Sequence, residues 1–388
     1  MGRVKLKNNI TSILFGTVLA AGLLGYLVKP DAGFSEFENR YLKQRPSVTL
    51  SGIMDGSFMS EFETYTSEQI PFRETFIKLK AVIERAEFKL ENNGIIRGND
   101  NQLFEKLLSY NKNLERNEGI IASFAEKADR DFYAAVIPNS FEIQGDRMPR
   151  GVPKVSEKSA LDEFYLKLSS FPHCKTVDLY DMLSLHSDEE IYYHTDHHWT
   201  SLGAYYGYLR LCDEMGLSPV DMGSLKKESA EGFYGTYYSK YKGVGIKPDS
   251  IDYYDTPSLS YVNLDDNSSH DGLYDTEKLS VYDKYAMFMY GNPGMAVIEK
   301  DGKGREGSKG SGQEQDPGTK SLVLFKDSYA NCLIPFLTYN YDRIVIIDLR
   351  YFGGSTAEIL SGNSGADVLL LYNFMHLSED SNFYKLLK

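Results

Sequence analysis

Residues 321–330 read Ser-Leu-Val-Leu-Phe-Lys-Asp-Ser-Tyr-Ala, an apolar run that passes into a short polar turn. The apolar part, Ser321 to Phe325, has the length and composition of a buried strand. The turn carries Ser328, and the pattern predicts a helix directly afterwards, over Ala330 to Tyr339. A buried strand that leads straight into a helix is typical of α/β proteins.

Other segments repeat this alternation. The apolar runs predict strands at Phe132–Ile137 (which Pro138 ends), Thr176–Tyr180, Arg343–Asp348 and Val368–Tyr372. Helices are predicted at Leu161–Leu168 and Ser201–Met215. Strands that alternate with helices indicate a doubly wound, mainly parallel sheet, in which functional residues gather at the carboxyl ends of the strands.

Composition restricts the class of protein. The chain has 388 residues, of which 42% are apolar and 25% are charged, as in a folded protein with one large α/β domain and additions. The formal charge of −13 argues against nucleic-acid binding, because phosphate backbones are bound by clustered Lys and Arg. The 29 tyrosines suit a sugar-binding protein. Cys174, Cys212 and Cys332 are scattered, so we expect buried structural thiols.

The N-terminus predicts a membrane anchor. Basic residues precede an apolar run from Ile10 to Val28, whose 19 residues would span about 28 Å as a helix. Positive charge before the run holds that end in the cytoplasm. A cleavable signal peptide is the alternative, since Val18-Leu19-Ala20 resembles a cleavage site, but the run continues well past Ala20. In both cases the rest of the chain lies outside the cytoplasmic membrane.

The expected organisation follows from these signals. It comprises a cytoplasmic tail (1–9), a transmembrane anchor (10–28), a membrane-proximal segment with a helix (29–90) and a catalytic domain (91–388). Residues 219–300 are rich in Tyr, Asp, Gly and Ser, and we expect an irregular or β-containing insertion there. Residues 301–320 are Gly-rich, charged and without aliphatic side chains, which predicts a mobile loop.

The densest chemical signal is His194-Thr195-Asp196-His197-His198-Trp199. Asp196 and His198 are two positions apart, so on an extended backbone both side chains would face one side, and His197 would point away. A carboxylate beside an imidazole can fix its tautomer and raise its basicity. A structural histidine cluster is one alternative. A metal site formed by His194, Asp196 and His198 is another, but no further ligand set shows metal spacing, so we expect neither metal nor cofactor.

Ser328 is the candidate nucleophile. A serine hydroxyl needs a base within hydrogen-bond reach, and a helix that begins beside it would offer free backbone N–H groups to an oxyanion. The alternative is that Ser328 only caps the helix.

The ten residues from Thr195 to Ala204 (Thr-Asp-His-His-Trp-Thr-Ser-Leu-Gly-Ala) resemble the signature of the DHHW family. That family is similar to the alginate O-acetyltransferases within the SGNH-hydrolase-like group. Weaker agreement comes from Glu38-Asn39-Arg40, Pro71-Phe72-Arg73, Phe233-Tyr234-Gly235-Thr236, Asp283-Lys284-Tyr285 with Gly291-Asn292, and Lys326-Asp327-Ser328-Tyr329.

The resemblance implies an SGNH-hydrolase-like, flavodoxin-like sheet with Ser328 as nucleophile, His198 as base and Asp196 as its orienting partner. It also implies transfer of an acetyl group onto an exopolysaccharide outside the membrane, with a polytopic membrane acyltransferase as donor. Ordinary SGNH hydrolases place the serine near the start, so the oxyanion residue stays open. The candidates are Asn292 first, then Asn139 and Asn373. Candidate substrate-binding residues are Tyr234, Tyr237, Tyr238, Tyr329 and Trp199.

We therefore expect a membrane-anchored, extracytoplasmic O-acyltransferase, most simply an O-acetyltransferase, that modifies a cell-surface polysaccharide. A carbohydrate esterase would use the same three residues with water as acceptor. A polysaccharide-binding protein of envelope or spore assembly would keep the fold without turnover, and a metal-dependent hydrolase would require bound zinc.

Overall fold

The computed structural model describes residues 2–35, 37, 40–87, 89–301 and 319–388. The chain divides into two compact units, one of Met1–Asn92 with Lys242–Gly245 and the other of Asn93–Tyr241 with Ile246–Lys388. The loop expected to be mobile at residues 301–320 lies, except for its ends, outside the described residues, as do Glu38 and Asn39 of the weaker motifs.

The first unit begins with α1 (Gly2–Val28). Within it, Ile10–Val28 is the one helical segment of the described chain that is long and apolar enough to cross a membrane. A signal sequence near the N-terminus has the same character, so the helix fits either role. The unit continues with β1 (Phe34–Ser35), β2 (Arg40–Tyr41), α2 (Leu50–Met54), α3 (Ser57–Glu68), α4 (Arg73–Ala86) and β3 (Glu91–Asn92).

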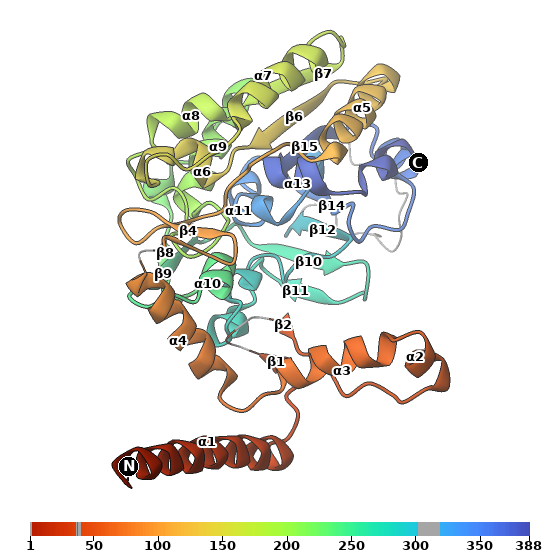
Figure 1. Ribbon diagram of the computed structural model, residues 1–388. Coiled ribbons are helices and arrows are strands. Elements are labelled where there is room, and N and C mark those ends of the chain that lie inside the picture. The colour runs from red at the N-terminus through yellow and green to blue at the C-terminus, as the bar shows by residue number, and fades with distance from the viewer. Residues whose placement is uncertain (1, 36, 38–39, 88, 302–318) are drawn as a thin grey trace. The chain divides into compact units, whose positions relative to one another are not determined.

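The second unit is a mixed α/β structure around a large, mostly parallel sheet (Figure 1). The strand order is β11-β10-β12-β14-β13-β15-β6-β7. From β14 to β7 all neighbours are parallel, whereas β12, β10 and β11 extend the sheet by antiparallel pairing. These strands are β6 (Phe132–Ile137), β7 (Cys174–Asp178), β10 (Leu259–Asn263), β11 (Ser269–Asp271), β12 (Met295–Lys300), β13 (Ser321–Lys326), β14 (Arg343–Ile347) and β15 (Asp367–Asn373).

Both faces of this sheet are buried, which is why the central strands are apolar along their whole length. In β13, Leu322 and Leu324 join the core on one face, while Val323 and Phe325 join the core on the other. The first face packs against α8 (Tyr180–Leu185), α9 (Ser201–Met215) and α11 (Ile334–Leu337). The second packs against α5 (Lys112–Lys127), α7 (Glu157–Leu168) and α13 (Phe374–Glu379).

The remaining elements of the unit are short. They are β4 (Ile95–Arg97), β5 (Leu103–Phe104), α6 (Ser140–Ile143), η1 (Gly145–Arg147), η2 (Met222–Ser224), β8 (Lys227–Phe233), α10 (Thr236–Tyr241), β9 (Asp249–Tyr254), η3 (Thr276–Ser280), η4 (Lys284–Met287), η5 (Ser328–Cys332), α12 (Thr356–Gly362) and η6 (Phe383–Leu387). Residues 219–300, the expected insertion, contain β-structure: β8 pairs with β9, and three of its strands belong to the main sheet.

Two helix predictions had different outcomes. The helix predicted at Ser201–Met215 is confirmed as α9, because Thr200 caps its first turn and Gly216, at a φ of 63°, ends it. The prediction of one continuous helix at residues 330–339 is wrong. A 3₁₀ turn, η5, begins earlier, at Ser328, because the Asp327 side chain already accepts the Tyr329 amide, and α11 follows as a separate short helix.

The close packing of α9 predicts opposite effects for two glycines in helices. A Cβ on Gly203 would lie 2.2 Å from the carbonyl oxygen of Ile191, whereas a Cβ on Gly119 in α5 would meet nothing within 4 Å. Gly203→Ala should therefore lower the free energy of unfolding by about 1–3 kcal/mol, as overpacking does. Gly119→Ala should raise it by about 0.5–1 kcal/mol. Chemical unfolding of both variants checks this, and similar stabilities would contradict the packing of α9.

Candidate active site

The histidine motif lies in a narrow turn between α8 and α9. Tyr192 and Trp199 form an antiparallel bridge at its base. The backbone amide of Tyr193 donates to the carbonyl oxygen of His198 at 3.2 Å. The turn therefore closes like a hairpin and presents the residues at its tip as one rigid group.

A carboxylate at the start of β9 anchors this turn. Asp249 accepts hydrogen bonds from the backbone amides of His194 (2.9 Å) and Thr195 (2.8 Å). It also accepts from the Thr195 hydroxyl at 2.5 Å. Amide groups in a turn need partners when they are buried, and Asp249 provides them from a distant part of the chain.

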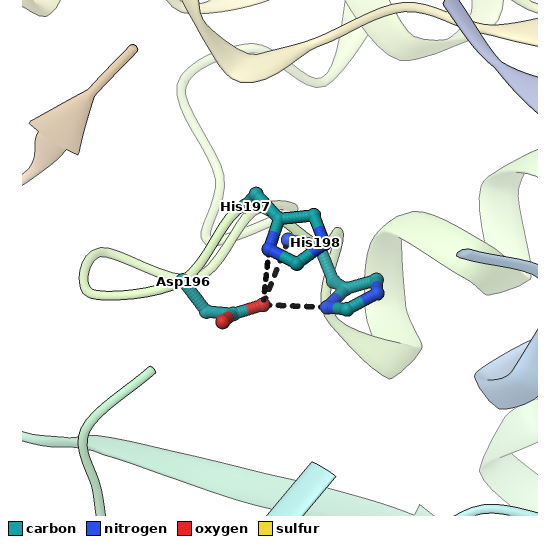
Figure 2. Close-up of side chains that lie close together, drawn as sticks. All are labelled: Asp196, His197 and His198. Atoms are coloured by element: carbon teal, nitrogen blue, oxygen red, sulfur yellow. Dashed lines mark hydrogen bonds and ion pairs between the residues drawn. The ribbon is translucent and has the colours of Figure 1, made fainter. Parts of the chain in front are cut away.

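Asp196, His197 and His198 follow a bend instead of an extended backbone. The backbone amide of His198 donates to Asp196 Oδ1 at 3.0 Å, as in an Asx turn. All three side chains consequently gather on one side (Figure 2). The prediction that His197 points away from Asp196 is wrong, because it assumed an extended chain: His197 Nδ1 lies 3.5 Å from Asp196 Oδ1.

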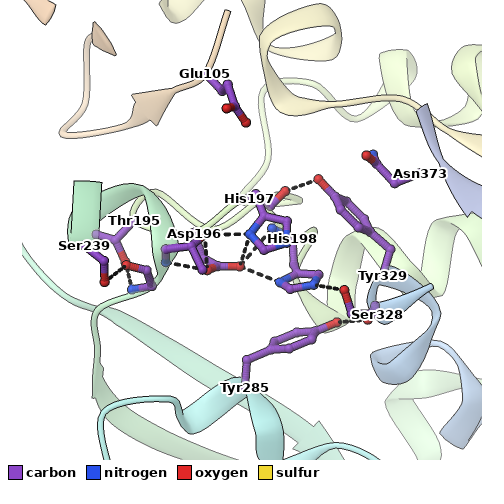
Figure 3. A network of polar contacts seen from close by, with 12 residues as sticks. Glu105, Thr195, Asp196, His197, His198, Ser239, Tyr285, Ser328, Tyr329 and Asn373 are labelled. Atoms are coloured by element: carbon purple, nitrogen blue, oxygen red, sulfur yellow. Dashed lines mark hydrogen bonds and ion pairs between the residues drawn. The ribbon is translucent and has the colours of Figure 1, made fainter. Parts of the chain in front are cut away.

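Asp196, His198 and Ser328 meet in one line of contacts (Figure 3). His198 Nδ1 lies 2.5 Å from Asp196 Oδ1, and His198 Nε2 lies 2.9 Å from Ser328 Oγ. The histidine and the serine are 130 positions apart in the sequence. The three residues singled out from the sequence therefore occupy the geometry that a serine, its base and an orienting carboxylate need.

Asp196 is the most heavily bonded group of the site. It is buried, and its Oδ2 accepts the Thr236 backbone amide at 2.7 Å and the Thr236 hydroxyl at 2.9 Å. Burial raises the pKa of a carboxyl group, but His197 and His198 outweigh it and hold the pKa of Asp196 well below its usual range. Asp196 is therefore an ionised acceptor at neutral pH.

His198 is enclosed between two rings. The Tyr285 ring stacks on it at 3.8 Å between centroids and 11° between planes, and the His197 ring lies 3.8 Å away at 37°. Burial, together with charge on His197, lowers the pKa of His198 to about 4, although Asp196 acts in the opposite direction. The imidazole is therefore neutral at pH 7. With Nδ1–H assigned to the bond with Asp196, Nε2 is free to accept the serine proton.

Ser328 begins η5 at the carboxyl end of β13. It does not cap that turn: Asp327 is the cap, and its Oδ1 accepts the Tyr329 amide at 2.9 Å. The Ala330 amide is also engaged, with the Asp327 carbonyl at 3.3 Å. The expectation of several free N–H groups is therefore wrong. Of the backbone amides of Ser328, Tyr329 and Ala330, only that of Ser328 lacks an acceptor within the described residues.

Comparison with known proteins identifies the family of the chain. A family model described as DHHW protein matches residues 117–347, more than half of the chain. The chain belongs to the DHHW family. No curated protein matches it significantly in sequence.

Solved structures resemble this DHHW protein in fold. A DHHW family protein from Eubacterium siraeum DSM 15702 is 21% identical, with a TM-score of 0.63 over 76% of this chain and 96% of that one. Bacillus cereus PatB1 is 20% identical, with a TM-score of 0.59 over 75% and 99%. The O-acetyltransferase domain of Pseudomonas putida AlgJ matches less well, at 12% identity and a TM-score of 0.42 over 74% and 93%.

The three asparagines considered for an oxyanion site differ in availability. Asn373 uses its amide nitrogen on the Ile137 carbonyl (3.0 Å) and on Asn139 Oδ1 (2.9 Å). Asn139 is buried and donates to Glu157 at 2.6 Å. These two hold strand ends together. Asn292 is exposed, and only its oxygen accepts hydrogen bonds, from Lys326 (3.2 Å) and Asn331 (3.0 Å).

The aromatic candidates separate by exposure. Trp199, Tyr237 and Tyr329 are at most 2% exposed, which argues against them as substrate-binding residues, because burial leaves them no face for a ligand. Trp199 instead donates its indole N–H to the Tyr329 carbonyl at 2.7 Å. Tyr234 and Tyr238 are partly exposed, with ring centroids 4.3 Å apart.

The metal alternative from the sequence named His194 with Asp196 and His198. His194 instead pairs through Nε2 with Glu190 at 2.6 Å, outside the cluster. Atoms of Asp196, His197 and His198 lie within 4.8 Å of one another, but the His197 Nδ1 is bonded to the Thr236 hydroxyl at 2.6 Å and the other facing atoms bond one another. The three cysteines are buried free thiols, as predicted.

Several residues that build the site were not predicted as site residues from the sequence, although Thr236, Tyr285 and Asp327 lie in the weaker family motifs. Asp249 and Thr236 hold the motif from elsewhere in the chain, and Tyr285 donates its hydroxyl to the Ser328 carbonyl at 3.0 Å. Asp327 accepts a hydrogen bond from the Asn373 backbone amide at 2.7 Å. Burial raises the pKa of Asp327, but His376 and this hydrogen bond outweigh burial and lower the pKa to about 2. Their types are ordinary turn and core residues, so only the fold reveals their roles.

The Thr236 hydroxyl is tested by a matched pair of variants. Thr236→Val removes the donor to Asp196 and the acceptor of His197, which should lower the free energy of unfolding by about 1–3 kcal/mol. Thr236→Ser keeps both hydrogen bonds and should lose much less. Chemical unfolding measures the two values. A greater loss in Thr236→Ser than in Thr236→Val would assign the effect to the methyl group and not to the hydroxyl.

Proposed function

We propose that this DHHW protein is a membrane-anchored, extracytoplasmic O-acyltransferase that places an acetyl group on a cell-surface polysaccharide. One observation carries the chemistry: Ser328 Oγ lies 2.9 Å from the neutral Nε2 of His198, whose Nδ1 is held by the ionised Asp196. The choice of acetyl group and polysaccharide rests on the likeness of the motif to the alginate O-acetyltransferases.

The reaction follows from these positions. Ser328 Oγ attacks the carbonyl carbon of the acyl donor, and His198 Nε2 takes the hydroxyl proton. The tetrahedral intermediate collapses, and His198 returns that proton to the leaving atom of the donor. An acyl-serine remains. A sugar hydroxyl then attacks it, losing its proton to His198, and the ester forms as the proton passes back to Ser328.

Oxyanion stabilisation would come from the amide of Ser328 and from the exposed amide of Asn292. Preorganised donors of this kind act where charge develops in the transition state. Tyr234 and Tyr238 suit the acceptor sugar, because their rings are partly exposed and α10 is tied to the histidine turn by the Tyr238 amide, 2.9 Å from the Thr195 carbonyl.

The proposed fold is the SGNH-hydrolase-like, flavodoxin-like form, with the serine at the carboxyl end of a central strand. The proposed arrangement is a cytoplasmic tail (1–9), an anchor (10–28), a membrane-proximal segment (29–90) and a catalytic domain (91–388). Because the anchor keeps the site at the membrane, a polytopic membrane protein is the proposed source of acyl groups.

The catalytic proposal predicts the loss of turnover in two variants. Ser328→Ala removes the nucleophile and His198→Ala its base, so each should lower kcat for an activated acetyl ester by roughly 10³-fold or more. His186→Ala, a surface histidine stacked on Tyr206, serves as the control and should keep wild-type kcat.

The same assay separates the transferase from its alternatives. Acetylated oligosaccharide should appear when sugar acceptors are added, and water alone should be the poorer acceptor. Release of acetate unaffected by any acceptor would indicate an esterase. Wild-type turnover no faster than that of Ser328→Ala would mean that the protein is not an enzyme of this kind.

The depressed pKa of His198 predicts an acid-tolerant enzyme. The base works only when Nε2 is unprotonated, so with a pKa of about 4 the value of kcat/KM should be level above about pH 5. It should fall tenfold per pH unit below about pH 4. A pH–rate profile measures the midpoint. A midpoint near 6.5, the ordinary imidazole value, would contradict the buried, neutral state of His198.

A further inference from the structure

A buried lysine lies two residues before the nucleophile. Lys326 ends β13, and its side chain is fully buried. Its ammonium donates to Asn331 Oδ1 at 2.7 Å and to Asn292 Oδ1 at 3.2 Å. A buried charge is costly unless it is paired, so a lysine at the end of a core strand needs a reason.

Pairing with the nearby carboxylate of Asp348 does not explain why Lys326 is buried. Asp348 Oδ2 lies 4.0 Å from the Lys326 ammonium, but Asp348 is already paired with Arg350, at 2.5 Å and 2.8 Å. Burial lowers the pKa of Lys326 to about 8, with Asp348 acting against it. The nearest partners of the lysine are therefore two asparagine oxygens and not a carboxylate.

These partners form a relay that ends at the surface. Asn331, which is buried, donates its amide nitrogen to Asn292 Oδ1 at 3.0 Å. Asn292 Oδ1 thus accepts from both an ammonium and an amide. Because a lysine can only donate, the orientation of the Asn292 amide is fixed: its oxygen faces inward. Its NH₂ group is left for a ligand, and the residue is exposed.

The relay includes a residue of the turn that carries the nucleophile. Ser328 and Asn331 are three residues apart in the 3₁₀ turn η5, so their side chains lie on the same face. The segment that carries Asn292 crosses this turn at a second point, where the Tyr285 hydroxyl donates to the Ser328 carbonyl at 3.0 Å. Residues 285–292 therefore form a strap over the turn that carries the serine.

The strap holds an unfavourable backbone just before Asn292. Met289, Tyr290 and Gly291 have φ angles of 60°, 54° and 95°, all in the left-handed region. For non-glycine residues such conformations cost of order 1–3 kcal/mol each and persist where the surroundings enforce them. The Asn292 side chain, bonded to Lys326 and Asn331, holds the exposed end of the strap.

We propose that Lys326 and Asn331 are positioning residues, which hold the Asn292 amide as an oxyanion donor next to the Ser328 backbone amide. The inference rests on the proposed acyl transfer and deepens it. The ammonium also polarises the Asn292 amide through its oxygen, since hydrogen bonds in a chain strengthen one another. Neither positioning residue touches the substrate; both act through Asn292.

The test is a double-mutant cycle with the full-length chain and an activated acetyl ester. Asn292→Ala should lower kcat by about 10²-fold and change KM little, as the loss of one oxyanion donor does. Lys326→Met should lower kcat about tenfold or more. The double variant should be no slower than Asn292→Ala, because Lys326 acts only through Asn292.

Two further variants keep the test decisive. Asn331→Asp still accepts from Lys326 but cannot donate to Asn292, so it should lower kcat even if Lys326→Met does not fold. Asn340→Ala removes an asparagine that only supports structure, bonded to the Tyr208 hydroxyl at 2.7 Å, and should leave kcat unchanged.

The outcomes are distinguishable. The relay would be overturned if the double variant lost kcat by the product of the two single losses, or if Asn292→Ala left kcat unchanged. Either result would leave the proposed acyl transfer intact. A lower free energy of unfolding with unchanged kcat in Lys326→Met and Asn331→Asp would reduce both residues to structural roles. Wild-type turnover equal to that of Ser328→Ala would overturn the proposed function and the relay with it.

Discussion

The buried carboxylate of Asp196 is the contact on which the rest of the site depends. Removal from water would protonate an isolated carboxyl group, yet Asp196 stays ionised because donors surround it. The donors are the backbone amide and Nδ1 of His198 on one oxygen, and the amide and hydroxyl of Thr236 on the other. One negative charge therefore fixes the bend of the turn, selects the tautomer of His198 and ties α10 to the motif. A carboxylate with fewer partners would do none of these things.

The histidine turn and the turn that carries Ser328 are attached to each other at two points. His198 meets Ser328, and the next residue in each segment also pairs, because the Trp199 indole donates to the Tyr329 carbonyl at 2.7 Å. The Tyr329 hydroxyl, in turn, contacts the His197 carbonyl. The tryptophan of the motif is therefore a structural tie, and its burial is the reason why it cannot serve a sugar. Consecutive contacts of this kind hold the relative position of His198 and Ser328 better than one hydrogen bond could.

The sequence identified what depends on composition and short spacing. Apolar runs located the central strands, and a strand followed by a serine turn pointed to Ser328, which lies 2.9 Å from His198, because both signals are local. The direction of His197 was mispredicted because a two-residue spacing gives no sign of the Asx turn that reverses it. The contacts of Asp249 and Thr236 were not predicted for a different reason: their partners are about 40 to 55 positions away, and the weak family motif that contains Thr236 does not indicate a contact with Asp196. The sequence around a single aromatic residue does not predict whether its ring is buried, so Tyr237 and Tyr238 were equally plausible as substrate-binding residues.

Burial and the charges around Ser328 keep the neighbouring His198 neutral at pH 7. His197 and His198 share one carboxylate, and protonation of the pair is unequal: Asp196 outweighs burial to raise the pKa of His197, while charge on His197 lowers that of His198. The side chain of His197 is the exposed member, at 28%, against 6% for His198. Asp196 therefore favours protonation of the histidine that water can solvate. The enclosed histidine, stacked under Tyr285, keeps an unprotonated Nε2 at 2.9 Å from the hydroxyl that it would have to deprotonate. The second histidine of the motif therefore acts on His198 through its charge, which together with burial lowers the pKa of His198.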